Sequence, residues 1–291
     1  MEYHTSITYC ELYRQGVEHL EKAQIAEASL DARLLLEWCC HTDRNTLLVH
    51  GERSITAEEF EKYADCLAKR ERHIPLQHIT GEQEFMGLTF VVNENVLIPR
   101  QDTEILVEEV MRHLHDGMSL LDMCTGSGCI LLSLLYYSND CTGLGLDISE
   151  AALQVARENA GRIGSRKENW NVTFLQSDLF ESDKLVDRKF DIIVSNPPYI
   201  RSDVIGTLMP EVKEHEPLLA LDGKEDGLYF YRRIIEDSGN YLFSGGKLFF
   251  EIGYDQGEAV KELLEAAGYQ EVEVIKDYAG LDRVVYGTLQ K

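Results

Sequence analysis

The tetrapeptide Asn196-Pro197-Pro198-Tyr199 directly follows an apolar, strand-like run and carries the most informative chemistry of the sequence. Two successive prolines lack backbone N–H groups and force the chain out of a sheet in a stiff, extended form, which leaves nearby carbonyls without matching donors. The Asn196 side-chain oxygen and the Pro197 carbonyl can together accept both protons of a planar –NH2 group, with Tyr199 as a flat wall. Such acceptors orient an amide or amino-heteroaromatic nitrogen and stabilise the positive charge that it gains while attacking a methyl-sulfonium.

A second motif lies in the stretch LDMCTGSGC, residues 121 to 129, where Gly126 and Gly128 let the backbone approach a ligand closely. A phosphate-binding P-loop would end in Gly-Lys-Ser/Thr, and the sequence has Cys129 after Gly128, which excludes a nucleoside triphosphate. A dinucleotide fingerprint would need a third glycine where Leu131 stands. The remaining ligand class is S-adenosylmethionine, a cationic cofactor without phosphate, which such loops hold beside an acidic residue. The alternative is a plain tight turn between a strand and a helix.

Polar side chains also end the next three strand-like runs. Asp147 lies about 20 residues further on, where a carboxylate can accept both hydroxyls of a ribose. Asp178 ends the third run, where it can accept from an adenine amino group, and Asn196 ends the fourth. Because the carboxyl ends of parallel strands meet at one edge of a sheet, where open α/β sheets bind ligands, the series predicts a nucleoside-containing cofactor.

The elements that position these residues alternate between strand and helix from residue 119 onward. This alternation predicts an α/β fold with a mostly parallel sheet covered by helices on both faces, closed by an antiparallel hairpin over residues 272–289. The predicted strands are 119–124, 141–148, 171–178, 190–195 and 245–253, and the helices are 128–137, 149–162, 229–242 and 256–269, with Ser149 as an N-cap.

The part of the chain before residue 100 has a different pattern. Residues 1–75 predict a small all-helical domain, in which Thr56 and Glu59 have capping-box spacing. Residues 76–100 predict a linking β-hairpin, with strands over 85–92 and 96–98 and a turn at 93–95. Asp102 or Thr103 is the expected cap of a helix that runs through Leu114 and opens the catalytic domain, residues 101–291.

Composition limits the partners of the chain. Its 291 residues are 44% hydrophobic and 27% charged, with 51 acidic against 28 basic residues and a net charge of −23. Proteins that grip nucleic-acid backbones carry Lys/Arg patches, so direct nucleic-acid binding is not expected. No run suggests a membrane span or a secretion signal, and the seven cysteines form no CxxC pair. We expect a cytoplasmic monomer without a disulfide framework or a metal.

Four segments carry a resemblance to a known family. SNPPY, LDMCTGSG, GEQEFMGLTFVVNENVLIPRQDTE and the tail DYAGLDRVV together resemble the release-factor glutamine methyltransferases, the PrmC/HemK family, over nearly the whole chain. The tetrapeptide alone also occurs in DNA aminomethyltransferases and in ribosomal-protein glutamine methyltransferases, whereas LIPRQDTE joined to it is much more specific. The implied fold is a Rossmann-like class I methyltransferase sheet behind a helical N-terminal domain that docks the substrate.

The resemblance implies methylation of the side-chain amide nitrogen of the glutamine in the GGQ motif of peptide-chain release factors. S-adenosyl-L-methionine would be the donor and S-adenosyl-L-homocysteine the product, with no metal. Carried over by position, Asn196 to Tyr199 would be catalytic and cradle the glutamine, and Arg100 would also bind the substrate. The cofactor positions would be Asp122, Cys124, Thr125, Gly126, Ser127, Gly128, Asp147, Asp178, Leu179 and Asn196.

Two positions depart from the family pattern. Cys124 stands where the loop has its first glycine, so the backbone there has to avoid a positive φ or tolerate strain. Leu179 follows Asp178 where some relatives have an aromatic residue against the adenine, so stacking would be weaker. Neither departure removes a group that does chemistry.

Three other functions fit parts of the pattern. A DNA or RNA aminomethyltransferase would have to flip a base and hold a phosphate backbone, against which the charge of −23 argues. A ribosomal-protein glutamine methyltransferase is separated from the favoured function by the resemblance alone. A NAD-dependent dehydrogenase or a non-catalytic nucleotide-binding module leaves the Asn-Pro-Pro-Tyr segment unexplained.

Overall fold

The computed structural model describes residues 7–165, 167 and 170–290. Its contacts form two compact units, Met1–Gly81 with Met209–His215, and Glu82–Leu208 with Glu216–Lys291. The first six residues, which belong to the stretch predicted to lack a secretion signal, lie outside the described part. No described helix is both long and apolar enough to cross a membrane.

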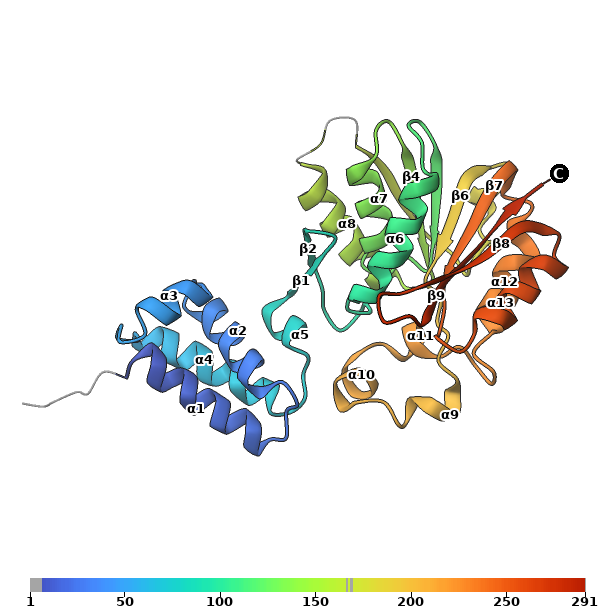
Figure 1. Cartoon of the computed structure of the whole chain (residues 1–291). Helices are drawn as coiled ribbons and strands as arrows, with labels where there is room; N and C mark the ends of the chain where they lie inside the picture. The colour runs from blue at the N-terminus through green and yellow to red at the C-terminus, as the bar shows by residue number, and fades with distance from the viewer. Residues whose placement is uncertain (1–6, 166, 168–169, 291) are drawn as a thin grey trace, which may run out of the picture. The chain divides into compact units, whose positions relative to one another are not determined.

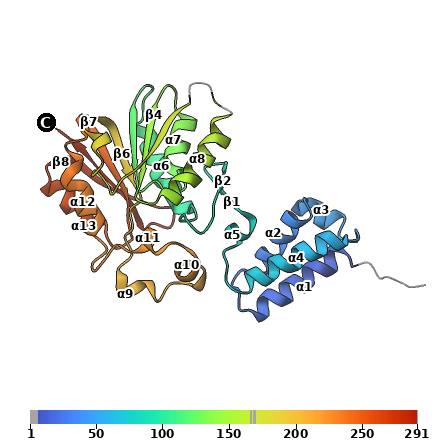
Figure 2. The ribbon, with the colours of Figure 1, turned by 180° about the vertical axis from the view of Figure 1, so that it is seen from behind.

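The first unit is all-helical (Figure 2). Its α2 and α4 pack on α1 around fully buried side chains, among them Leu20, Leu35 and Tyr63. The capping box predicted at Thr56 and Glu59 is confirmed. The helices are α1 (Tyr9–Lys22), α2 (Ala28–Cys39), α3 (Arg44–Val49), α4 (Ala57–Arg70), α5 (Leu76–Thr80) and α10 (Pro210–His215).

A buried arginine joins α10 to this unit, although α10 comes 130 residues after α5 in the sequence. Arg70 on α4 is 6% exposed. Its Nε lies 2.7 Å from Asp31 on α2, and its Nη2 lies 2.9 Å from Glu211 on α10. A buried guanidinium needs such partners, because an unpaired charge away from water is costly. The sequence analysis predicted that this unit ends at residue 75, and it did not predict that α10 belongs to the unit.

The second unit is built on the mixed, mostly parallel sheet that the sequence predicted. Its strand order is β5-β4-β3-β6-β7-β9-β8, in which β9 alone runs antiparallel to its neighbours β7 and β8. The strands are β3 (Ser119–Met123), β4 (Thr142–Asp147), β5 (Asn171–Gln176), β6 (Phe190–Ser195), β7 (Leu242–Glu251), β8 (Tyr269–Lys276) and β9 (Asp282–Leu289).

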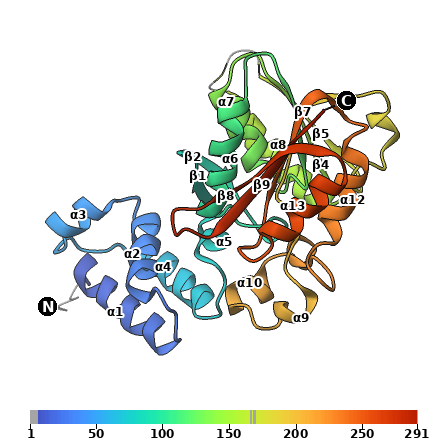
Figure 3. The same cartoon turned by 45° about the vertical axis from the view of Figure 1, so that its right-hand side comes forward.

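Helices cover both faces of this sheet (Figures 1 and 3). Leu120 and Phe249 pack into the core under α6, α7 and α8, whereas their neighbours Leu121 and Phe250 pack into the core under α12 and α13. This alternation follows the period of two of a strand, and because both faces are buried the inner strands β3 and β6 are mostly apolar. The helices are α6 (Gln101–His113), α7 (Cys129–Tyr137), α8 (Glu150–Gly164), α12 (Tyr229–Ser238) and α13 (Gly257–Ala266).

The linking hairpin forms, but with a different turn from the predicted one. β1 (Glu82–Phe85) pairs with β2 (Leu88–Val91), so the turn is Met86-Gly87, and residues 96–98 form no strand. Both turn residues have positive φ, 51° and 68°, which matches the two-residue hairpin turn that best suits the strand twist. The hairpin belongs to the second unit.

The two predicted helix caps have different outcomes. Ser149 caps α8, accepting from the Ala152 N–H, as predicted. The cap predicted at Asp102 or Thr103 is wrong, because α6 already begins at Gln101 and its N-cap position, Arg100, makes no side-chain cap bond. Thr103 is therefore inside the first turn, where its side chain is free to serve another purpose.

After β6 the chain leaves the sheet through short helices that the sequence analysis did not predict, α9 (Ser202–Ile205) and α11 (Leu218–Leu221), with α10 between them. The returning chain pairs with the segment that follows Asn-Pro-Pro-Tyr. Ile200 donates to the Leu221 carbonyl and accepts from the Gly223 N–H at 3.0 and 2.8 Å. A Cβ at Gly223 would lie 2.6 Å from the Tyr199 Cα, so a glycine is required there.

We predict that Gly223→Ala lowers the free energy of unfolding by about 1–3 kcal/mol, because the added methyl pushes against backbone that two hydrogen bonds hold in place. Gly206→Ala is the matched control, since a Cβ there meets no atom within 4 Å. Urea denaturation of both variants measures the difference, and equal stability would show that the Tyr199 backbone is not tightly fixed.

Candidate active site

A cavity of about 340 Å³ lies in the second unit at the carboxyl ends of β3, β4, β5 and β6. Its volume is in the range of pockets that hold a small cofactor. It is lined by ten residues that the sequence singled out, Arg100, Cys124, Thr125, Gly126, Ser127, Asp147, Asp178, Leu179, Asn196 and Pro198. Four others, Asp122, Gly128, Pro197 and Tyr199, are not among the lining residues.

Asp122 supports the glycine-rich loop from beneath. It is fully buried, and its Oδ2 accepts from the Thr125 hydroxyl at 2.5 Å. Burial raises the pKa of this carboxyl to about 7, against the lowering effect of the Thr125 hydrogen bond. The Thr125 N–H donates in turn to the Leu146 carbonyl at 2.8 Å, which ties the loop to the end of β4. Asp122 thus shapes the loop and does not face the cavity.

Asp147 ends β4 with both carboxylate oxygens held by backbone. Oδ2 accepts from the Gly126 N–H and Oδ1 from the Ser149 N–H, each at 2.9 Å. Burial raises the pKa of Asp147, and these two hydrogen bonds counteract the rise. Each oxygen keeps a lone pair for a further donor, so a fixed pair of acceptors faces the cavity, as two vicinal hydroxyls require.

Two residues that line the cavity have a positive φ, which residues with a side chain rarely adopt. Cys124 has φ 61° and Leu179 has φ 49°, both in the left-handed region. Of the two outcomes expected for Cys124, its backbone tolerates the strain of a positive φ and does not avoid it. This strained residue lies in the turn that bends the loop over the cavity. Burial also raises the pKa of the Cys124 thiol, so it stays neutral.

The wall around Asp178 contains residues that sequence reasoning missed. Arg233 on α12 donates from Nη1 to Asp178 Oδ1 at 2.9 Å, and its guanidinium lies 5.7 Å from the centre of the Tyr229 ring. Tyr229, Phe230 and Arg233 all line the cavity. The aromatic rings beside Asp178 therefore come from α12, whereas Leu179 has none.

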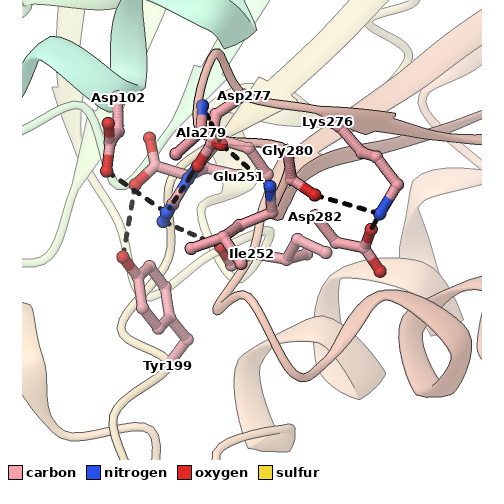
Figure 4. Close-up of polar contacts among 11 residues, drawn as sticks. Asp102, Tyr199, Glu251, Ile252, Lys276, Asp277, Ala279, Gly280 and Asp282 are labelled. Atoms are coloured by element: carbon pink, nitrogen blue, oxygen red, sulfur yellow. Dashed lines mark hydrogen bonds and ion pairs between the residues drawn. The ribbon is translucent and has the colours of Figure 1, made fainter.

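The Asn-Pro-Pro-Tyr segment presents two of its four side chains to the cavity. Asn196 and Pro198 line it, and the Asn196 Nδ2 lies 3.4 Å from the hydroxyl oxygen of Thr103, another lining residue. Tyr199 is not among the residues that line the cavity, so it does not form the flat wall predicted there. Its hydroxyl donates to Glu251 Oε1 at 3.3 Å (Figure 4), and burial raises its pKa.

Arg100 lines the same cavity and is held by a buried acid. Its Nη2 forms a short ion pair with Glu216, whose carboxyl has a raised pKa because it is buried. The arginine head is therefore oriented, but its charge is already paired within the protein.

Comparisons with known proteins agree with this geometry. Two family models match, described as the PrmC N-terminal domain over residues 11–81 and a methyltransferase domain over residues 114–224. A release factor glutamine methyltransferase of Caulobacter vibrioides is 41% identical over 97% of this chain and 96% of its own length. The chain belongs to the release factor glutamine methyltransferase family. It is an enzyme of the methyltransferase class, as the resemblance of its motifs implied.

Other relatives support the same assignment. A release factor glutamine methyltransferase of Clostridium botulinum is 42% identical over 94% of this chain and 97% of its own length. A methyltransferase from Pyrococcus furiosus, solved as a crystal structure, covers 70% of this chain and 90% of its own, with 20% identity and a TM-score of 0.52. That likeness shows the shared Rossmann-like fold.

Most of the residues missed by sequence reasoning have no local signature. Arg233, Tyr229 and Phe230 lie on a helix that the sequence did predict, but periodicity says which face is buried and not which face meets a ligand. The sequence offers Thr103 only as a helix cap, and Glu251 falls within a predicted strand. The signal that was available for Glu251 is its charge within the apolar run LFFEIG, since buried carboxylates need a reason.

We predict that the free energy of unfolding of Cys124→Gly exceeds that of Cys124→Ala by about 1 kcal/mol. Glycine adopts the left-handed φ without strain, whereas alanine is strained there as cysteine is. Both variants lack the thiol, so the difference between them measures the backbone alone. Urea denaturation of the pair gives the value. If the alanine variant proved equal or more stable, Cys124 would not be strained.

We predict that Asp122→Asn changes how stability depends on pH. The folded-state pKa is raised from 3.8 to about 7, so the unfolded chain loses this proton first, and the wild-type protein loses stability as pH rises between these values. The asparagine variant lacks this contribution, so it should gain stability relative to wild type over the same window, by up to about 4 kcal/mol. Urea denaturation at several pH values tests this, and a constant difference would contradict it.

Proposed function

We propose that this chain transfers the methyl group of S-adenosyl-L-methionine to the side-chain amide nitrogen of the glutamine in the GGQ motif of peptide-chain release factors. The observation that carries the proposal is that one cavity is lined both by the loop with Asp147 and by Asn196 with Pro198. Groups that suit a nucleoside cofactor and groups that suit a planar –NH2 therefore line one cavity in a chain of this family.

The lining fits S-adenosyl-L-methionine. Asp147 offers two backbone-fixed oxygens for the ribose hydroxyls, Asp178 offers an acceptor for the adenine amino group, and Tyr229 and Phe230 supply aromatic faces. The backbone of Cys124 to Gly128 would lie close to the rest of the cofactor. When bound, the cofactor supplies a methyl group on a sulfonium centre.

Asn196 is proposed to act on the nucleophile. An amide nitrogen is weakly nucleophilic because its lone pair is delocalised, and it gains positive charge as it attacks. The Asn196 oxygen and the Pro197 carbonyl would accept its two N–H groups, which orients the lone pair and stabilises the developing charge. Tyr199, whose hydroxyl donates to Glu251 at 3.3 Å, would hold the Asn196 and Pro197 acceptors in place. Arg100, which lines the cavity, would bind the substrate.

The all-helical unit is proposed to dock the release factor. None of the described residues that line the cavity comes from this unit, so its role is not to hold the cofactor. Its α3 leaves Leu48 and Val49 each 73% exposed, and adjacent exposed apolar side chains are typical of surfaces that bind protein. The acidic chain would work in the cytoplasm, as a monomer, without direct contact to nucleic acid.

We predict that Asn196→Ala abolishes methyl transfer but leaves the dissociation constant of the cofactor within about tenfold, because Asn196 acts on the attacking nitrogen. Transfer is measured with methyl-labelled cofactor and a purified release factor, and cofactor binding by calorimetry. Normal turnover of the variant would refute the proposed role of Asn196.

We also predict that the labelled residue is the glutamine of the GGQ motif. A release factor in which this glutamine is replaced by glutamate has no side-chain –NH2 group and should take up no label. Mass spectrometry of wild-type factor, and of a cytosolic extract incubated with the enzyme, identifies the modified residue. Label on a ribosomal protein, or undiminished label on the altered factor, would identify a different acceptor.

A further inference from the structure

The Asn-Pro-Pro-Tyr segment has few groups with which it can hold itself in place. Pro197 and Pro198 have no backbone N–H, so half of the segment cannot donate to a neighbouring strand. Because proline also fixes φ, the segment is stiff, and its position depends on how its two ends are held. The sheet holds the first end, since β6 ends at Ser195. What holds the Tyr199 end therefore helps to decide where the proposed acceptors lie.

The side chain of Gln256 holds the Tyr199 end. Gln256 follows β7 and is only 9% exposed. Its Nε2 donates to the Tyr199 carbonyl at 3.1 Å and to the Gly227 carbonyl at 3.3 Å. An –NH2 group has two protons, and each of these carbonyls can accept one of them. The buried carboxamide thus links the end of the Asn-Pro-Pro-Tyr segment to the chain that leads into α12.

The direction of this carboxamide is fixed from its other side. The Gln256 Oε1 accepts from the Gly253 N–H at 2.9 Å, and the Tyr231 hydroxyl lies 3.4 Å from the same oxygen. A backbone N–H can only donate, so the oxygen has to face Gly253 and the –NH2 group has to face the two carbonyls. Turning the carboxamide over would leave no hydrogen bond to Gly253 or to the carbonyls. Its donors are therefore directed at Tyr199 and Gly227.

Two further features show that the side chain of Gln256 is fitted to this contact. A Cβ at Gly227 would lie 2.5 Å from the Tyr199 carbonyl oxygen and 2.7 Å from the Gln256 Nε2, so only a glycine leaves room for the contact. Gln256 also occupies the N-cap position of α13, but its side chain makes no cap bond to that helix. A buried polar side chain needs partners, and the contact with Tyr199 supplies them.

We propose that Gln256 is a positioning residue for methyl transfer, which fixes the Tyr199 end of the Asn-Pro-Pro-Tyr segment and through it the acceptors that orient the substrate –NH2 group. The inference rests on the proposed function. Gln256 is not among the described residues that line the cavity, so it acts through Tyr199 and does not touch the substrate. Because transfer is sensitive to a misplacement of about 1 Å, loss of this contact should slow the reaction.

The test compares Gln256→Met, which keeps the length but has no amide, with Gln256→Asn, which keeps the amide but is one methylene shorter. Ser238→Ala is the matched control, because it removes buried hydrogen bonds at the last residue of α12. The Ser238 hydroxyl donates to the Ile235 carbonyl at 3.0 Å and lies 2.6 Å from the Tyr269 hydroxyl.

For each protein we would measure kcat and KM for a release factor and the melting temperature. Calorimetry with S-adenosyl-L-homocysteine gives its dissociation constant and the number of binding sites. Expressing kcat per binding site removes the effect of any unfolded protein, so a general loss of stability does not count as a loss of catalysis.

We expect both Gln256 variants to lower kcat per binding site at least about tenfold, because neither presents a donor to the Tyr199 carbonyl. KM for the release factor and the dissociation constant of S-adenosyl-L-homocysteine should stay within about threefold, since the contact does not involve the cofactor loop. Ser238→Ala should melt at a lower temperature than wild type and yet keep kcat within about twofold.

Three results would overturn the proposal: wild-type kcat in either Gln256 variant, a loss of kcat in Ser238→Ala as large as theirs, or a loss matched by weaker binding of S-adenosyl-L-homocysteine. If Gln256→Met fails to fold, Gln256→Asn decides alone, because asparagine is favoured at an N-cap. A wild-type enzyme that labels no glutamine of the GGQ motif would instead refute the proposed function. The same variants, assayed with the acceptor that is labelled, would then still test Gln256.

Discussion

Three parallel strands end at the same level of the sheet, and everything in the cavity depends on that register. Met123 at the end of β3 is paired with Leu146 on one side and with Ser195 on the other. The loop after β3, Asp147 at the end of β4 and Asn196 directly after β6 therefore lie side by side at this edge of the sheet. Since a shift of one residue would exchange the faces of a strand, the two buried cores hold this register.

The same register explains why so much could be predicted from the sequence. Apolar runs of strand length that end in Asp or Asn are local signals, and the parallel pairing follows from the alternation of strand and helix. Asp147 and Asn196 are thus brought to one cavity by a rule that needs no coordinates. The closing hairpin and the Ser149 cap were likewise encoded within a few residues.

What could not be predicted depends on contacts between distant segments. The turn at Met86-Gly87 competes with the equally turn-like residues 93–95, and pairing across the hairpin decides between them. The sequence predicts Tyr199 as a flat surface for a planar group. The position of its ring, however, is set by contacts with Glu251 and Gly223, which are 52 and 24 residues away in the sequence. Arg233 reaches Asp178 from a helix whose phase is not visible in a single sequence.

The ion pairs of Arg70 have a consequence for how this chain can be divided. Because α10 is part of the helical unit, the chain crosses between the two units three times, near residues 81, 208 and 216. A fragment that stops at residue 81 would lack Glu211, so the Arg70 guanidinium would keep its ion pair with Asp31 and lose the one with Glu211. A chimera between family members therefore has to exchange residues 209–215 along with the N-terminal part, because no single cut separates the two units.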